Sequence, residues 1–189
     1  GIVVPLDKAL PENEIKSLIE RSEVEAICYS KKYDESMKKF KSECVGNLKH
    51  LISMDLEKHE DGVYSLKELI ERGKELIKEG DRNFLDAKID AEKMGMLLFT
   101  SGTTSTSKAV ELSHKIICTN LMDIASVLQI NENDTMLSFL PMHHAFECTA
   151  GFLYPMYKGA EVVFCEGIKH IADNLKEYQV TAMISVPIL

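Results

Sequence analysis

The chain has 189 residues, of which 45% are hydrophobic, and a formal net charge of −8 at pH 7. This length and apolar content suit a globular domain of ordinary size, or one large part of a multidomain protein. The acidic balance argues against nucleic-acid binding, which needs a basic surface, and against docking on an anionic membrane by charge alone. We therefore expect no nucleic-acid partner, and no apolar run is long enough to predict a transmembrane segment.

The five cysteines are widely spread and include no C-x-x-C pair. Such an odd, scattered set does not suit a disulfide framework or a zinc knuckle, and it favours the reduced thiols of a cytoplasmic protein. The start of the chain does not resemble a secretory leader. Both ends lie in apolar stretches and the first residue is not methionine, so we expect a piece of a longer protein.

Helical and strand-like hydrophobic patterns alternate along the chain. Strands are predicted over residues 1–5, 24–29, 48–54, 94–99, 135–140, 161–165 and 181–186. Helices are predicted over residues 11–21, 33–44 and 65–77, from Ser113 for about 15 residues, and over residues 147–157 and 168–178. Residues 57–64 and 83–93 are predicted as polar connections, and Ser65 with Glu68 has the spacing of a capping box. This alternation predicts an α/β fold with a layered, largely parallel sheet and helices on both faces.

The most unusual stretch follows the strand predicted at residues 94–99. From Thr100 to Ser107 every side chain except that of Gly102 carries a hydroxyl, and Lys108 comes next. Closely approaching backbone N–H groups, hydroxyl donors and a lysine charge together suit a phosphate. The spacing is not that of the common P-loop, in which a glycine directly precedes the lysine. Composition alone would also fit an ordinary polar surface loop.

A second polar segment, residues 141–147, follows the strand predicted at residues 135–140 and contains His143 and His144. Ligands bind at the carboxyl ends of parallel strands, so this segment and the hydroxyl-rich loop are expected to share a cleft. Adjacent side chains of an extended segment point in opposite directions, and no neighbouring residues complete a zinc pattern. Besides a shared ligand cleft, two other interpretations of this segment remain. The two histidines could bind a metal, or the segment could be a turn with one buried, hydrogen-bonded histidine.

The stretch from Thr100 to Lys108 resembles the Thr-Ser-Gly-Thr-Thr-Gly-x-Pro-Lys-Gly loop of the adenylate-forming (AMP-binding) superfamily. Ser105, Ser107 and Ala109 stand where that motif has Gly, Pro and Gly. Residues 140–146 resemble the superfamily's Leu-Pro-x-x-His-x-Phe element, which lines its acyl pocket. The resemblance extends through nearly the whole chain and is least distinctive over residues 31–90. It implies the N-terminal part of the acyl-CoA synthetase fold.

The resemblance also implies a function, that of a long-chain fatty acid–CoA ligase. Such an enzyme uses ATP and Mg²⁺ to convert a carboxylic acid into an acyl-adenylate, and then transfers the acyl group to CoA. Lys108 would stabilise the departing pyrophosphate, Thr103 or Thr104 would contact Mg²⁺, and His144 and Phe146 would face the acid. The phosphate-binding residues would be Thr100, Ser101, Gly102, Thr103, Thr104, Ser105, Thr106 and Lys108.

Residues 140–148 contain no aspartate, whereas amino-acid-activating members of the superfamily have one near the position of His144. An uncharged acyl or aryl acid is therefore the expected substrate. The superfamily's magnesium glutamate, ribose aspartate and C-terminal catalytic lysine would all lie after Leu189. We expect residues 1–189 to be a truncated N-terminal domain that is inactive alone. A ligase that loads a carrier protein, an aryl-acid ligase and a non-catalytic nucleotide- or phosphate-binding module remain alternatives.

Overall fold

The computed structural model describes residues 1–100 and 107–186. The chain forms two compact units. The first unit is Lys8–Ile89, and the second unit consists of Gly1–Asp7 together with Asp90–Leu189. The prediction that these residues belong to one truncated N-terminal domain stays a prediction.

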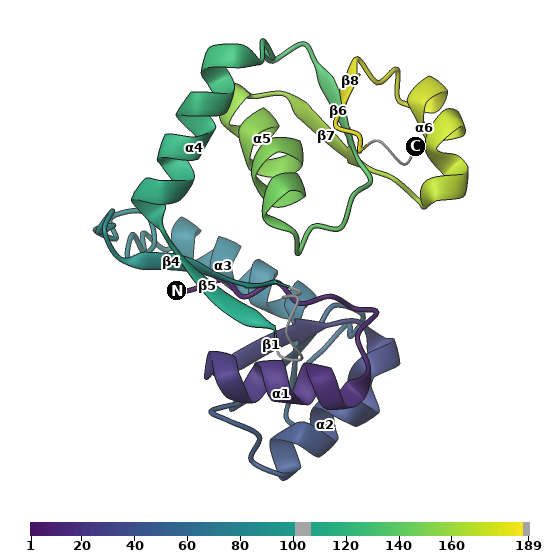
Figure 1. Cartoon of the computed structure of the whole chain (residues 1–189). Coiled ribbons are helices and arrows are strands. Elements are labelled where there is room, and N and C mark those ends of the chain that lie inside the picture. The colour runs from purple at the N-terminus through teal and green to yellow at the C-terminus, as the bar shows by residue number, and fades with distance from the viewer. Residues whose placement is uncertain (101–106, 187–189) are drawn as a thin grey trace. The chain divides into compact units, whose positions relative to one another are not determined.

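A parallel three-stranded sheet in the order β1-β2-β3 forms the centre of the first unit (Figure 1). The strands are β1 (Ala26–Tyr29), β2 (His50–Ser53) and β3 (Val63–Ser65). Leu51 of the central strand pairs with Ile27 on one side and with Val63 on the other. Leu51 and Val63 are both buried, as expected for a parallel sheet that has helices packed against it.

The helices of the first unit are α1 (Glu12–Ser22), the 3₁₀ turn η1 (Lys31–Tyr33), α2 (Asp34–Ser42) and α3 (Leu66–Lys78). Helices α1 and α2 bury Ile19 and Phe40 almost completely. Each side chain of this size contributes about 1.5–3 kcal/mol when it leaves water. Helix α3 differs, because it has no buried residue. Its apolar side chains Leu69, Ile70 and Ile77 remain exposed.

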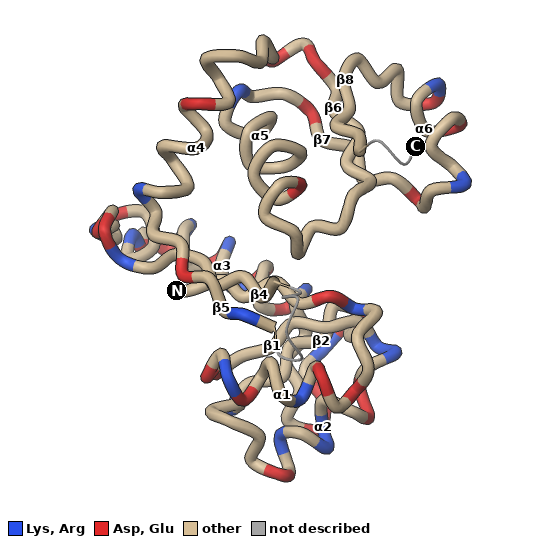
Figure 2. Tube along the Cα trace, viewed as in Figure 1, with Lys and Arg blue, Asp and Glu red and all other residues tan. Residues whose placement is uncertain are grey.

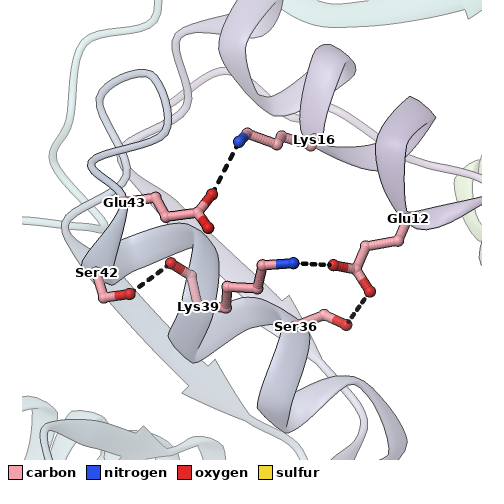
Figure 3. A network of polar contacts seen from close by, with 6 residues as sticks. All are labelled: Glu12, Lys16, Ser36, Lys39, Ser42 and Glu43. Atoms are coloured by element: carbon pink, nitrogen blue, oxygen red, sulfur yellow. Dashed lines mark hydrogen bonds and ion pairs between the residues drawn. The ribbon is translucent and has the colours of Figure 1, made fainter.

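Polar side chains link α1 and α2 along their exposed surface (Figure 3). The Glu12 carboxylate accepts hydrogen bonds from the Lys39 ammonium at 3.1 Å and from the Ser36 hydroxyl at 3.0 Å. The Lys16 ammonium lies 2.8 Å from the Glu43 carboxylate. Exposed ion pairs of this kind each contribute about 0–1 kcal/mol, so buried apolar side chains rather than these pairs hold the helices together.

Two separate sheets build the second unit. Strand β4 (Met94–Thr100) pairs with β5 (Lys108–Ser113) as an antiparallel hairpin, and Val3 forms a parallel bridge to Met96 of β4. The other sheet is parallel and has the order β7-β6-β8. Its strands are β6 (Thr135–Ser138), β7 (Glu161–Phe164) and β8 (Ala182–Met183).

The helices of the second unit are α4 (His114–Val127), the π-helix η2 (Glu147–Leu153), α5 (Tyr154–Lys158), the 3₁₀ turn η3 (Ile168–His170) and α6 (Ile171–Glu177). Ile130, Met136 and Tyr154 form a buried cluster, against which Leu121 and Ile124 of α4 pack. The Tyr154 hydroxyl donates a hydrogen bond to the carbonyl oxygen of Leu128, so its polar atom is satisfied within the core.

The prediction of an α/β fold with largely parallel strands and helices is confirmed. Two strands of the structure correct the predicted order of elements. Strand β3 lies partly within the connection predicted at residues 57–64, and β5 lies between the hydroxyl-rich loop and α4, where no strand was predicted. Among the described residues, no helix is long and apolar enough to cross a membrane.

The predicted capping box at α3 forms only in part. The Ser65 hydroxyl accepts a hydrogen bond from the Glu68 N–H at 3.2 Å, as predicted. The Glu68 carboxylate, however, accepts from the backbone N–H of His59 rather than from that of Ser65. Glu68 therefore connects the start of the helix to the preceding loop.

Candidate functional site

The β4–β5 hairpin holds both ends of the hydroxyl-rich loop. Thr100 pairs with Lys108 in the antiparallel register, and the Thr100 hydroxyl lies 3.5 Å from the Lys108 carbonyl oxygen. Neighbouring strands lie about 5 Å apart, so the loop leaves and re-enters the sheet over a short distance. Both Thr100 and Lys108 are exposed. The other predicted phosphate-binding residues lie outside the described residues: Ser101, Gly102, Thr103, Thr104, Ser105 and Thr106.

The sequence of the hairpin explains why its two strands differ. Strand β4 is apolar and buries Leu97 and Leu98, whereas β5 begins with four exposed residues. Helix α4 then starts directly after β5, where the Ser113 hydroxyl accepts from the Ile116 N–H at 3.2 Å. This confirms Ser113 as the predicted N-cap. The order is strand, loop, strand and helix, and Lys108 is the first residue of the returning strand.

The second predicted segment follows β6, which ends at Ser138, and its last residue, Glu147, is the first residue of the π-helix η2. The backbone N–H of His144 donates to the Pro141 carbonyl oxygen at 3.0 Å, and the N–H of Cys148 donates to the His144 carbonyl oxygen at 3.0 Å. These bonds fold the segment into a turn. The side chains of His144 and Phe146 are exposed at its surface, with Phe146 57% exposed.

The two adjacent histidines have different surroundings. The His143 side chain is 18% exposed, and its Nε2 atom lies 3.7 Å from an oxygen of Asp7. Burial lowers the pKa of His143, with His144 acting in the same direction and Asp7 opposing both. The two imidazole rings have centroids 4.3 Å apart and are tilted by 42°. The described residues contain no group of three or more His, Cys, Asp or Glu side chains arranged to hold a metal.

Three residues in or beside the second segment were not among the predicted site residues. Asp7 contacts His143 from the far end of the sequence. Ser138 and Glu147 are buried and joined by a hydrogen bond of 2.6 Å. The contact between Asp7 and His143 joins residues far apart in sequence, so no local sequence pattern could have predicted it. Glu147 could have been noticed in the sequence, because it begins a stretch that otherwise contains almost no charged residue.

Both predicted parts of the site belong to the second unit, and α4 contacts both the hairpin and η2. Two hollows lie elsewhere, one of about 650 Å³ beside α3 and one of about 500 Å³ at the start of α4. The cleft expected between the hydroxyl-rich loop and residues 141–147 stays a prediction.

Comparison with known proteins identifies the class. The AMP-binding enzyme family matches residues 1–189, and the chain belongs to this family. It is 30% identical over 132 residues to the long-chain-fatty-acid–[acyl-carrier-protein] ligase AEE15 of Arabidopsis thaliana, a match that covers 67% of this chain and 18% of that protein. It is 28% identical over 207 residues to long-chain-fatty-acid–CoA ligase 1 of Homo sapiens, covering 98% of this chain and 28% of that protein.

Solved structures agree with this assignment at the level of the fold. ATP-bound MatB from Rhodopseudomonas palustris is similar with a TM-score of 0.75 at 19% identity, covering 100% of this chain and 35% of that one. The chain spans less than a third of the length of each of the two relatives from Arabidopsis thaliana and Homo sapiens. Its membership of the AMP-binding enzymes confirms the resemblance stated from the hydroxyl-rich loop.

Proposed function

We propose that the complete protein containing this chain is an acyl-CoA synthetase of the long-chain fatty acid type. It would join a carboxylic acid to ATP, releasing pyrophosphate, and then transfer the acyl group from the adenylate to CoA. Membership of the AMP-binding enzymes is the observation that carries this proposal. The similarity to human long-chain-fatty-acid–CoA ligase 1 over 98% of this chain supports the substrate class.

The β4–β5 hairpin supports a role in binding phosphate. Lys108 is exposed at the point where the hydroxyl-rich loop returns to the sheet, so its ammonium is available to an anion. In our proposal, residues 100–106 supply hydroxyl and backbone N–H donors, and Lys108 stabilises the charge that develops on pyrophosphate. Thr103 or Thr104 would contact the Mg²⁺ that accompanies ATP.

The turn after β6 supports a role in binding the acid. Phe146 and His144 are exposed there, and in our proposal they contact the substrate. An apolar ring beside an imidazole suits an uncharged acyl chain, because no carboxylate in residues 140–146 would pair with a substrate ammonium. The five cysteines are free, which supports a cytoplasmic location.

The acceptor of the acyl group has a second candidate. The relative from Arabidopsis thaliana is by name a ligase for an acyl carrier protein and is 30% identical to this chain. A carrier-protein thiol is therefore the alternative to CoA. An aryl acid in place of a fatty acid is a further alternative, because anthranilate CoA ligase AuaEII has a similar fold with a TM-score of 0.78.

Pyrophosphate exchange by the complete protein with a panel of fatty and aryl acids tests the first half-reaction. We expect exchange with long-chain fatty acids and little exchange with aryl acids. Product formation with CoA and with a phosphopantetheinylated carrier protein then separates the two acceptors. Residues 1–189 alone should show no exchange. Absence of exchange by the complete protein with every acid would support a non-catalytic nucleotide-binding module instead.

A further inference from the structure

Glu147 has a buried acidic side chain in a largely uncharged helical stretch. It is the first residue of η2 and is 1% exposed. Along η2 and α5 only Lys158, at the opposite end, also carries a charge, and Figure 2 shows the helix between them free of charged positions. A carboxyl group is rarely buried so completely without a specific partner, because removing it from water is costly.

Ser138 provides that partner. Its hydroxyl donates a hydrogen bond of 2.6 Å to Oε1 of Glu147, and Ser138 is itself only 4% exposed. Ser138 is the last residue of β6, and Glu147 is the first residue of η2. The bond therefore joins the two ends of the segment between them, residues 139–146, which contains His144 and Phe146.

Gly151 leaves the space that the carboxyl group occupies. A Cβ atom built on Gly151 would lie 2.6 Å from Cδ, Oε1 and Oε2 of Glu147. Gly151 lies within the π-helical stretch of η2, and such wide turns occur frequently at functional sites. A side chain at position 151 would therefore displace the Glu147 carboxyl group from its place beside Ser138.

The exposed side chains His144 and Phe146 lie on the turn whose two ends this bond joins. Phe146 is 57% exposed, and His144 is exposed with its ring against that of His143. Two backbone bonds shape the turn locally, from His144 to Pro141 and from Cys148 to His144. The His143 ring, which lies against Asp7, holds the middle of the turn, and the Ser138–Glu147 bond joins its two ends.

We propose that Ser138 and Glu147 form a clasp that positions His144 and Phe146 for the acid substrate. Glu147 is in this view a positioning residue, which acts through the turn and does not touch the reacting atoms. The inference rests on the proposed function of the turn in binding the acid. It predicts that breaking the clasp weakens binding of the acid and leaves binding of ATP unchanged, because the strands on either side of the hydroxyl-rich loop, β4 and β5, form another sheet.

Steady-state kinetics of the complete enzyme tests the clasp. Ser138→Ala and Glu147→Ala should each raise the KM for the fatty acid about tenfold and change the KM for ATP by less than about twofold. Glu147→Gln should stay close to the wild type, because the amide oxygen still accepts the serine hydrogen bond. Gly151→Ala, which displaces the carboxyl and changes neither partner, should reproduce the effect of Ser138→Ala.

Glu161→Ala is the matched control for Glu147→Ala. Glu161 of β7 accepts a hydrogen bond of 3.3 Å from the Thr135 hydroxyl of β6, so it too is a hydroxyl–carboxylate pair of this sheet, but an exposed one. We expect unchanged KM values for both substrates. Equal increases in the KM for acid and for ATP in Ser138→Ala, or a Glu147→Gln variant as impaired as Glu147→Ala, would overturn the proposal.

Alkylation of Cys148 gives a readout that needs no catalytic activity. Cys148 is buried directly beside Glu147, whereas Cys118 is exposed and provides an internal reference. Burial raises the pKa of the Cys148 thiol, and the Glu147 charge raises it further. Opening of the clasp should increase the rate of iodoacetamide labelling at Cys148 several-fold, as measured by mass spectrometry.

Ser138→Ala is the decisive variant in this assay. It keeps the glutamate, so faster labelling reports opening of the turn rather than loss of a neighbouring charge. It also decides the matter if Glu147→Ala does not fold. Labelling of Ser138→Ala at the wild-type rate would refute the clasp. A wild-type enzyme that activates no acid would refute the proposed function instead, and the labelling rates would still test whether the clasp holds the turn.

Discussion

The backbone of Gly95 lies directly against the imidazole ring of His114. A Cβ atom built on Gly95 would come within 2.7 Å of Cε1 and 2.8 Å of Nδ1 of that ring. Gly95 belongs to β4, at the point where its pairing with β5 shifts in register, and His114 is the first residue of α4. The contact connects the strand that enters the hydroxyl-rich loop with the helix that follows β5.

Gly95→Ala should lower the free energy of unfolding by about 1–3 kcal/mol, because the imidazole has to leave its place. The double variant Gly95→Ala/His114→Ala should recover part of that loss, since the clashing atoms are gone. Urea unfolding followed by circular dichroism measures both. Gly73→Ala in α3 is the control, because a Cβ atom built on Gly73 would have nothing within 4 Å, and it should be neutral or stabilising. Strict additivity of the two substitutions would contradict the contact.

Lys108→Ala in the complete protein should reduce pyrophosphate exchange about 10²–10³-fold, if the lysine stabilises the departing pyrophosphate as a preorganised charge. Lys115→Ala is the matched control. Lys115 is also an exposed lysine of the second unit, and its ammonium is paired with Glu92 at 2.7 Å. Its removal should leave exchange unchanged. A Lys108→Ala enzyme with the wild-type rate would exclude the lysine from the reaction.

Local sequence signals predicted much of the fold. Apolar runs identified β1, β2, β4, β6 and β7. The capping box at Ser65 identified the start of α3, and Ser113 as an N-cap identified the start of α4. Strand β3 was missed because it is only three residues long and lies in a polar context. Its partner is β2, and such pairing across the sheet is a tertiary interaction that no short window of sequence contains.

The candidate site was predictable to a smaller extent. The hydroxyl-rich loop stood out by composition, but β5 did not, because Lys108–Ser113 is mostly exposed and lacks a buried face. The connection between β4 and β5 also has none of the short Asn-Gly or Asp-Gly turns that announce a hairpin. The contact between Asp7 and His143 joins residues from distant parts of the chain, so only the folded structure shows it.

The stability of the second unit should depend on pH through His143. Burial lowers the pKa of this imidazole, and Asp7 opposes the effect. The folded chain therefore takes up a proton at His143 less readily than the unfolded chain does. The stabilisation is complete above the ordinary pKa of 6.5 and is lost as the pH falls from there through the lower pKa of the folded state.

His143→Gln, which has no titrating ring, should make the free energy of unfolding fall less steeply on acidification from about pH 8 to about pH 5. Asp7→Asn should have the opposite effect, because it removes the group that raises the pKa of His143. Urea unfolding at a series of pH values gives the slopes. Parallel profiles for wild type and His143→Gln would show that burial does not perturb the imidazole.

Ser65→Ala should destabilise the start of α3 by about 1–3 kcal/mol, because the Ser65 hydroxyl makes two hydrogen bonds in a buried position. It accepts from the Glu68 N–H and donates to the Leu56 carbonyl oxygen at 2.6 Å, so alanine leaves both groups without their partner. Hydrogen exchange of the amides in α3 measures the loss locally.

Ser42→Ala in the same unit is the comparison that isolates burial as the cause. The Ser42 hydroxyl also donates to a backbone carbonyl, that of Lys39 at 2.7 Å, but at an exposed position near the end of α2 (Figure 3). Water replaces the lost partner there, so the change should stay within about 0.5 kcal/mol.

Because α3 has no fully buried residue, we expect its N-terminal hydrogen bonds to contribute a large part of its stability. Equal exchange rates in α3 for wild type and Ser65→Ala would show that packing outside the helix start determines its order instead.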